Sequence, residues 1–201
     1  MFPLSTVLFP HARLPLHVFE PRYRALTQDC LASDSSFGVV LIERGSEVGG
    51  GDQRMDVGTR ATIIESVEFP DGRWLLLVQG EERFRVADWL GEDPYPAATV
   101  EDWPPRREAV DPGLLRRVTG IVRQARGLLS ESGDAPAMAV EAEFDEDPDI
   151  ASWQLCAEAP LNMIDAHRLL SARGTVERLE LLRQVMEEMV LDLHRMLGSG
   201  S

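Results

Sequence analysis

Two histidines in the C-terminal half each follow an aspartate by two positions, as the pairs Asp165/His167 and Asp192/His194. A carboxylate beside an imidazole is the combination that catalytic dyads and metal sites use. Both pairs lie in segments with helical periodicity, where positions i and i+2 point about 200° apart around the axis. The two side chains of a pair therefore cannot share a helix face, and neither pair predicts a catalytic or metal site.

The other two histidines, His11 and His17, flank a proline-rich turn and could converge on a metal ion, although polar packing is the favoured interpretation. No segment matches the Gly-x-Ser-x-Gly turn that presents a nucleophilic serine. All 20 basic residues are arginine, so the sequence has no lysine for a phosphate loop, a Schiff base or a Ser-Lys dyad. We expect no catalytic residue, no metal site and no cofactor.

The composition is that of a globular protein with one compound domain or two small ones. The chain has 201 residues, of which 44% are hydrophobic and 27% charged. Its formal net charge is −14, and neither half of the sequence is basic, which argues against a nucleic-acid partner. No apolar run is long enough to span a membrane, so a cytoplasmic protein is expected. Cys30 and Cys156 are expected to be buried free thiols.

The first half of the chain consists of short β-branched runs broken by proline and glycine, which predict strands. The expected strands are 4–9, 14–19, 37–43, 57–69, 73–79, 82–86 and 97–103. The segments 57–69 and 73–79 form a hairpin around Pro70-Asp71-Gly72. A glycine-rich connection at 45–52 is an unconvincing phosphate loop, because no helix start follows it.

The second half of the chain is predicted to be helical. Asp111 and Pro112 mark a helix start, and apolar residues then recur at helical spacing to about residue 130. Further helices are expected at 149–158, 161–171 and 176–197. The sequence therefore predicts an α+β protein with a strand-rich subdomain at 1–105, a helical subdomain at 106–197 and a flexible tail at 198–201.

The segment 14–24 combines apolar residues, two prolines and a set of charges, and predicts a strand that proline bends into a helix. At this junction Glu20 can cap backbone N–H groups or pair with an arginine of the sheet, such as Arg83 or Arg85. A structural role is favoured over a functional one for Glu20, Arg22 and Arg24.

This segment, together with 37–42, 57–59, 70–73 and 80–86, resembles the N-terminal substrate-binding domain of Lon proteases in order and spacing. The resemblance continues through 149–153 and 159–161, so it covers nearly the whole chain. It implies a PUA-like β-barrel followed by a C-terminal helical bundle. The family also includes stand-alone bacterial proteins and a related domain in cereblon.

The resemblance implies a non-catalytic protein-binding module for exposed apolar segments of client or partner proteins. A separate ATP-dependent protease is one candidate partner. The ATPase and protease modules of Lon need lysines that this sequence lacks, so no peptidase activity is expected. Two other classes remain open: an RNA-associated PUA-like protein, and a small-molecule or hydrolytic site in the groove between barrel and helices.

The residues expected to bind a client lie where prolines interrupt strand pairing and leave backbone groups available. A peptide groove is predicted at a seam near Leu16, Phe19 and Tyr23, close to the hairpin tip with Phe69 and Trp74. The alternative is that these side chains fill the core. Burial separates the two interpretations, because an exposed anchor contributes to a complex and little to folding.

Overall fold

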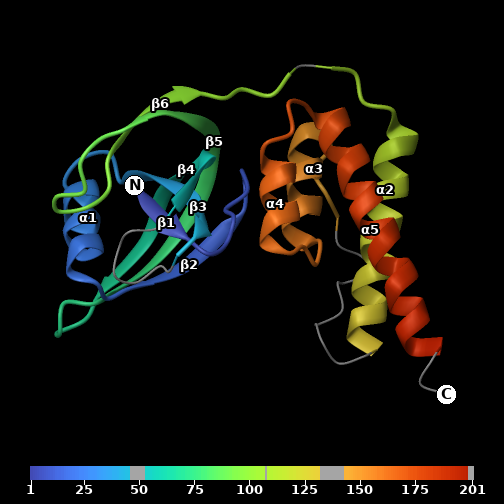
Figure 1. Ribbon diagram of the computed structural model, residues 1–201, viewed down its shortest axis with the longest axis horizontal. Coiled ribbons are helices and arrows are strands. Elements are labelled where there is room, and N and C mark those ends of the chain that lie inside the picture. The colour runs from blue at the N-terminus through green and yellow to red at the C-terminus, as the bar shows by residue number, and fades with distance from the viewer. Residues whose placement is uncertain (46–52, 107, 132–142, 199–201) are drawn as a thin grey trace. The chain divides into compact units, whose positions relative to one another are not determined.

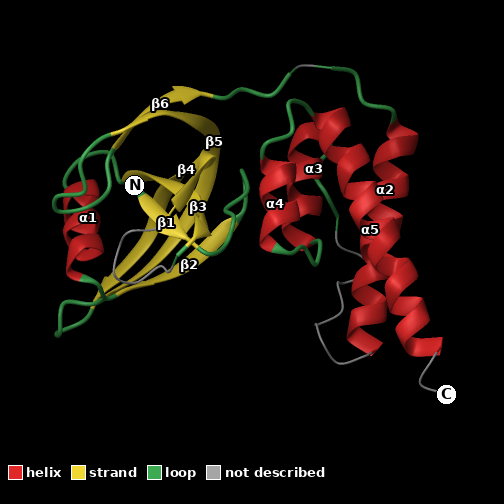
Figure 2. Cartoon of the chain, in the orientation of Figure 1, coloured by secondary structure: helices red, strands yellow, loops and turns green. Residues whose placement is uncertain are grey.

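The computed structural model describes residues 1–45, 53–106, 108–131 and 143–198. The chain divides into two compact units, Met1–Pro104 and Pro105–Ser201. The glycines 49–51, considered above as a phosphate loop, and the tail residues 199–201 lie outside the described residues. The first unit contains the strands with one helix and the second is helical, which confirms the α+β class (Figures 1 and 2).

The first unit is a curled sheet of six strands in the order β1-β3-β4-β5-β2, with β6 also paired to β5 (Figure 1). The strands are β1 (Phe2–Leu4), β2 (Arg13–Val18), β3 (Ser36–Arg44), β4 (Gln53–Glu68), β5 (Trp74–Trp89) and β6 (Ala98–Asp102). The pair β1–β3 is parallel and the other pairs are antiparallel. Because β1 and β2 end the order without pairing to each other, the described strands form a half-barrel.

The predicted hairpin joins β4 to β5. The Phe69 N–H donates to the Arg73 carbonyl oxygen over 2.8 Å, and Gly72 adopts a φ of 79°, which favours glycine. The strands expected at 73–79 and 82–86 are one continuous strand, β5. Gly80 lies inside this strand, where a Cβ would collide with the carbonyl oxygen of Phe9. The glycine therefore marks a close approach of the Phe9 backbone to β5 and does not end the strand.

The strand expected at 4–9 is wrong in its position, since β1 spans Phe2–Leu4. Leu8 and Phe9 are nevertheless buried, so their apolar character reflects packing in the core rather than strand pairing. The Thr59 hydroxyl donates to the Leu8 carbonyl oxygen over 2.6 Å and holds this segment against the sheet.

Helix α1 (Pro21–Leu31) packs against the curled sheet and shares its core. Proline at its first turn suits the start of a helix, where its missing N–H costs no bond. The helix buries Tyr23, Leu26, Thr27 and Cys30. Three of these join the core of the first unit, which also contains residues from the inner faces of β1 to β5.

The second unit contains α2 (Pro112–Glu131), α3 (Pro148–Glu158), α4 (Met163–Leu170) and α5 (Thr175–Gly198). Side-chain caps begin three of these helices: Asp111 accepts from the Gly113 N–H, Asp147 from the Asp149 N–H, and Asn162 from the Asp165 N–H. Helix α2 packs mainly on α5, as Figure 2 shows. None of the helices in the described ranges is long and apolar enough to cross a bilayer.

Candidate functional site

Strand β2 lies at an edge of the sheet, because its one strand partner among the described residues is β5. Side chains alternate along a strand, so Leu16 and Val18 point into the core and are buried. Pro15 and His17 point outward and are exposed. This strand therefore offers both an outer face and an open edge.

The outer face beside β2 carries a group of exposed apolar side chains. Val67 of β4 lies opposite Leu75 of β5, which in turn lies opposite His17 of β2. Opposite residues in antiparallel strands share a face, so these three side chains form a row. Val67 is 54% exposed and Leu75 is 45% exposed.

Two phenylalanines extend this row at the same end of the sheet. The ring centroid of Phe19, which is 51% exposed, lies 6.2 Å from that of His17. Phe69 follows Val67 by two positions and is also exposed, with the Arg73 guanidinium 5.8 Å from its ring centroid. We call the surface formed by the following residues the hairpin face: His17, Phe19, Val67, Phe69 and Leu75.

A groove of about 300 Å³ runs beside β2. One wall consists of residues 14–20, and the opposite wall comes from β1 and the residues that follow it. Phe2 and Tyr23 also line the groove, and their rings stack with centroids 4.2 Å apart. His17 and Phe19 belong to both the groove and the hairpin face, so the two surfaces are continuous.

The residues expected to anchor a client fall into two groups. Leu16, Tyr23 and Trp74 are buried in the core of the first unit, where they pack instead of forming exposed anchors. Leu16 and Tyr23 still contribute to the groove wall, and Trp74 does not. Phe19 and Phe69 are exposed and lie at the same end of the sheet.

Sequence reasoning missed Val67 and Leu75. A signal for Leu75 was present, because residues 74–78 are apolar at every position. Such a run indicates a strand that is covered on both faces. In the structure the even-numbered residues of this run are buried, whereas Leu75 is exposed. The continuous apolar run therefore does not show which alternate residues face the core.

The polar junction differs from the one expected. The Glu20 side chain makes no capping hydrogen bond to α1. Among the described residues, its carboxylate pairs with Arg22 at 3.2 Å instead of with Arg83 or Arg85. Register explains this, because β2 pairs with the first half of β5, whereas both arginines lie in its second half. Arg83 is buried, and Arg85 pairs with Asp56 at 3.2 Å.

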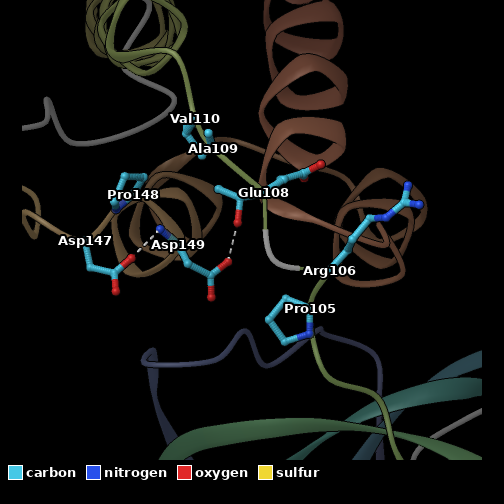
Figure 3. A pocket seen from close by; sticks show the side chains of 9 residues that line it. Pro105, Arg106, Glu108, Ala109, Val110, Asp147, Pro148 and Asp149 are labelled. Atoms are coloured by element: carbon cyan, nitrogen blue, oxygen red, sulfur yellow. Dashed lines mark hydrogen bonds between the residues drawn. The ribbon is translucent and has the colours of Figure 1, made fainter.

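A larger pocket, of about 590 Å³, lies in the second unit and has an acidic lining (Figure 3). Glu108 accepts a hydrogen bond from the Val176 N–H at 2.8 Å, in the first turn of α5. Asp147 caps α3, as Figure 3 shows, and Asp149 accepts from the Thr175 hydroxyl at 2.6 Å. The carboxylates of Asp147 and Glu108 therefore accept hydrogen bonds from backbone N–H groups in the first turns of α3 and α5, where negative charge is favourable. We interpret this pocket as a helix-capping cluster.

Beneath these caps lies Arg178, whose side chain is 0% exposed. Its Nε donates to the Ser152 hydroxyl at 2.9 Å, and its Nη2 donates to the Asp149 carboxylate. The guanidinium carbon lies 3.3 Å from the centroid of the Trp153 ring. Burial lowers the pKa of Arg178. Asp149, Ser152 and Trp153 carry part of the sequence resemblance noted above, and the structure assigns them a packing role around this arginine.

The two cysteines are buried free thiols. Burial raises the pKa of Cys30 to about 11 and that of Cys156 to about 12. Neither thiol is poised as a nucleophile, because a raised pKa leaves little thiolate at neutral pH. No group of three or more histidine, cysteine or acidic side chains could hold a metal ion in the part of the chain that the structure describes.

Comparison with known proteins places these features in context. A family model described as the ATP-dependent protease La (LON) substrate-binding domain matches residues 1–188. Lon protease 2 of Herpetosiphon aurantiacus is 28% identical over 188 residues, which cover 92% of this chain and 23% of that protein. Lon protease of Flavobacterium johnsoniae is 27% identical over 189 residues, with the same coverages. The chain thus spans about a quarter of the length of these relatives.

Two solved structures have a similar fold. A Lon N-terminal domain protein from Xanthomonas campestris aligns with a TM-score of 0.66 and 28% identity, covering 90% of this chain and 94% of that one. The N-terminal domain of Lon protease from the Mycobacterium avium complex aligns with a TM-score of 0.59 and 16% identity, covering 92% and 96%. At this lower identity the second likeness concerns the fold alone.

Proposed function

The chain belongs to the family of Lon substrate-binding domains, and from that premise we propose that it is a protein-binding module for exposed apolar segments of client proteins. The observation that carries the proposal is the hairpin face, on which four exposed apolar side chains lie beside His17. Soluble proteins rarely present contiguous apolar surface of this kind unless it is used for binding. An apolar client segment would remove it from water.

The adjoining groove supports the same role. A client segment that extends from the hairpin face past Phe19 reaches the groove, which Phe2 and Tyr23 line. Aromatic side chains bury large apolar areas and are common at the centres of protein interfaces. The surface thus combines an apolar face with a narrow recess, which suits a chain segment better than a folded domain.

We propose that the role is non-catalytic and that bound clients pass to an ATP-dependent protease. The relatives that this chain matches are named Lon proteases, and the match covers about 23% of their length. ATP-dependent proteolysis by a Lon protease needs a phosphate-loop lysine and a Ser-Lys dyad, and these 201 residues contain no lysine. The acids of the second-unit pocket are already used to cap helices.

Binding of an unfolded client tests the proposal. Fluorescein-labelled, reduced and carboxymethylated lactalbumin, which cannot refold, is titrated with the protein and followed by fluorescence anisotropy. Val67→Asp places a charge on the hairpin face and is expected to weaken binding about tenfold or more. Val100→Asp is the matched control, because Val100 is also an exposed strand valine but lies on β6. Equal binding by both variants and the unmodified protein would contradict the proposal.

A further inference from the structure

The backbone groups on the two sides of β2 can be assigned from its ladder with β5. In an antiparallel pair, the backbone N–H and C=O groups of every second residue bond to the partner strand. The backbone groups of the residues between them point to the opposite side. The Gly80 N–H donates to the Ala12 carbonyl oxygen at 2.8 Å, just before β2 begins. The even-numbered residues of β2 therefore bond to β5. Arg13, Pro15 and His17 direct their backbone groups to the other side.

The hairpin supports this assignment independently. The Phe69 N–H donates to the Arg73 carbonyl oxygen at 2.8 Å, so the odd-numbered residues at the start of β5 bond to β4. The even-numbered residues of β5 must then bond to β2. Pro15 agrees as well, because proline is tolerated in a strand where its missing N–H would have faced away from the ladder.

The outward side of β2 is an open sheet edge that faces the groove. No other strand in the described ranges pairs with it. Two N–H donors, from Arg13 and His17, and three carbonyl acceptors, from Arg13, Pro15 and His17, lie along this edge. The groove follows the same stretch, since residues 14–20 form one of its walls. Unpaired edges of this kind are templates for an added strand.

We propose that a client segment binds as an additional β-strand along the open edge of β2. This inference rests on the proposed function and specifies how the client is held. Side chains of an added strand alternate between two faces. One set would extend the hairpin face beside His17 and Phe19, and the other would point toward the groove. The preferred client segment is therefore extended and apolar at alternate positions.

Charge adds a preference for acidic residues at one end of the segment. The chain has a net charge of −14, yet residues 13–24 contain three arginines and one acid. Arg22 already pairs with Glu20, and Arg24 packs over Gly72 in the hairpin turn. Arg13 is exposed at the start of β2 and makes no ion pair with the described residues. A carboxylate of the client near Arg13 would complement this charge.

Amide hydrogen exchange by NMR tests the mode of binding. The probe is a short peptide with valine at every second position, threonine between the valines and glutamate at each end. In the free protein the amides of Arg13 and His17 should exchange faster than those of Leu14 and Leu16. Saturating peptide should slow exchange at Arg13 and His17 roughly tenfold or more, because these amides gain hydrogen bonds. Unchanged exchange at both would overturn the inference.

A pair of variants isolates the backbone bond. His17→Pro and His17→Val both remove the imidazole, but only the proline removes the outward N–H, and neither change touches a bond to β5. His17→Pro is expected to bind the peptide about threefold to tenfold more weakly than His17→Val. Peptides N-methylated at alternate amides give the same test on the unmodified protein, should the proline variant fail to fold. Methylation of one alternate set should abolish binding, and methylation of the other should be tolerated.

The outcomes separate this inference from the proposed function. If carboxymethylated lactalbumin binds and Val67→Asp weakens it, while the His17 variants bind the peptide equally, strand addition is wrong and the proposed function stands. If no unfolded client binds, both fail. A dimer in sedimentation whose Arg13 and His17 amides are protected without peptide would show that a second copy occupies the edge, which overturns the inference.

Discussion

Replacing Arg178 with methionine is expected to destabilise the helical unit by about 3 kcal/mol. The side chain is 0% exposed and donates to the Asp149 carboxylate and the Ser152 hydroxyl. Removing one member of a buried ion pair typically costs about 3–5 kcal/mol, because the other member keeps its desolvation penalty without its partner. The lower end applies here, since Asp149 is 32% exposed and water can partly replace the guanidinium.

The assay is urea unfolding followed by far-ultraviolet circular dichroism, which reports mainly on the helical unit. Arg183→Met is the matched control, because Arg183 lies on the same helix and pairs with Glu180 at 2.9 Å and Glu187 at 2.6 Å on a partly exposed surface. Solvent screens such pairs, so the control should change stability little. A decrease in the free energy of unfolding of less than about 1 kcal/mol for Arg178→Met would show that the buried network contributes little to stability.

Three further predictions concern packing and reactivity. Gly120→Ala should raise the free energy of unfolding by about 0.5–1 kcal/mol, because this helical position is exposed and an added methyl meets no atom within 4 Å; a lower melting temperature would contradict it. Cys30 and Cys156 should react slowly with a disulfide reagent at neutral pH and rapidly in urea, since burial raises their pKa values to about 11 and 12; equal rates in both solutions would show accessible thiols. Tyr23→Ala should cost about 3–5 kcal/mol because the ring is buried, whereas Phe19→Ala should leave the melting temperature nearly unchanged and weaken client binding; similar melting shifts for both variants would refute the division between core and surface.

Much of the local structure could be predicted from the sequence because its signals are local. Proline stands at the first turn of three helices, at Pro21, Pro112 and Pro148. Gly72 supplies the positive φ that the hairpin turn needs. These features depend on backbone geometry within a few residues, so no knowledge of the packing was required. The join of 73–79 to 82–86 was missed because glycine commonly interrupts a strand, whereas Gly80 accommodates the backbone of Phe9, which is distant in the sequence.

The candidate site was predicted only in part, for a physical reason. The apolar run at 74–78 is visible in the sequence, but periodicity alone cannot say which alternate residues face the core. That choice depends on how β5 pairs with β2 and β4, and it buries Trp74 while exposing Leu75. Leu16 of β2 and Tyr23 of α1, which were expected as anchors, are buried in the same core.

The fold class, the hairpin and the family of this protein could be predicted from the sequence alone, because they depend on residue order and local geometry. The burial of Arg178 and the position of β2 at the edge of the sheet became apparent only in the tertiary structure. Arg178 is buried because Asp149 and Ser152 reach it from another helix, and separation along the chain hides that contact. The edge of β2 is open because no other described strand pairs there, a property that belongs to the whole sheet and to no single segment.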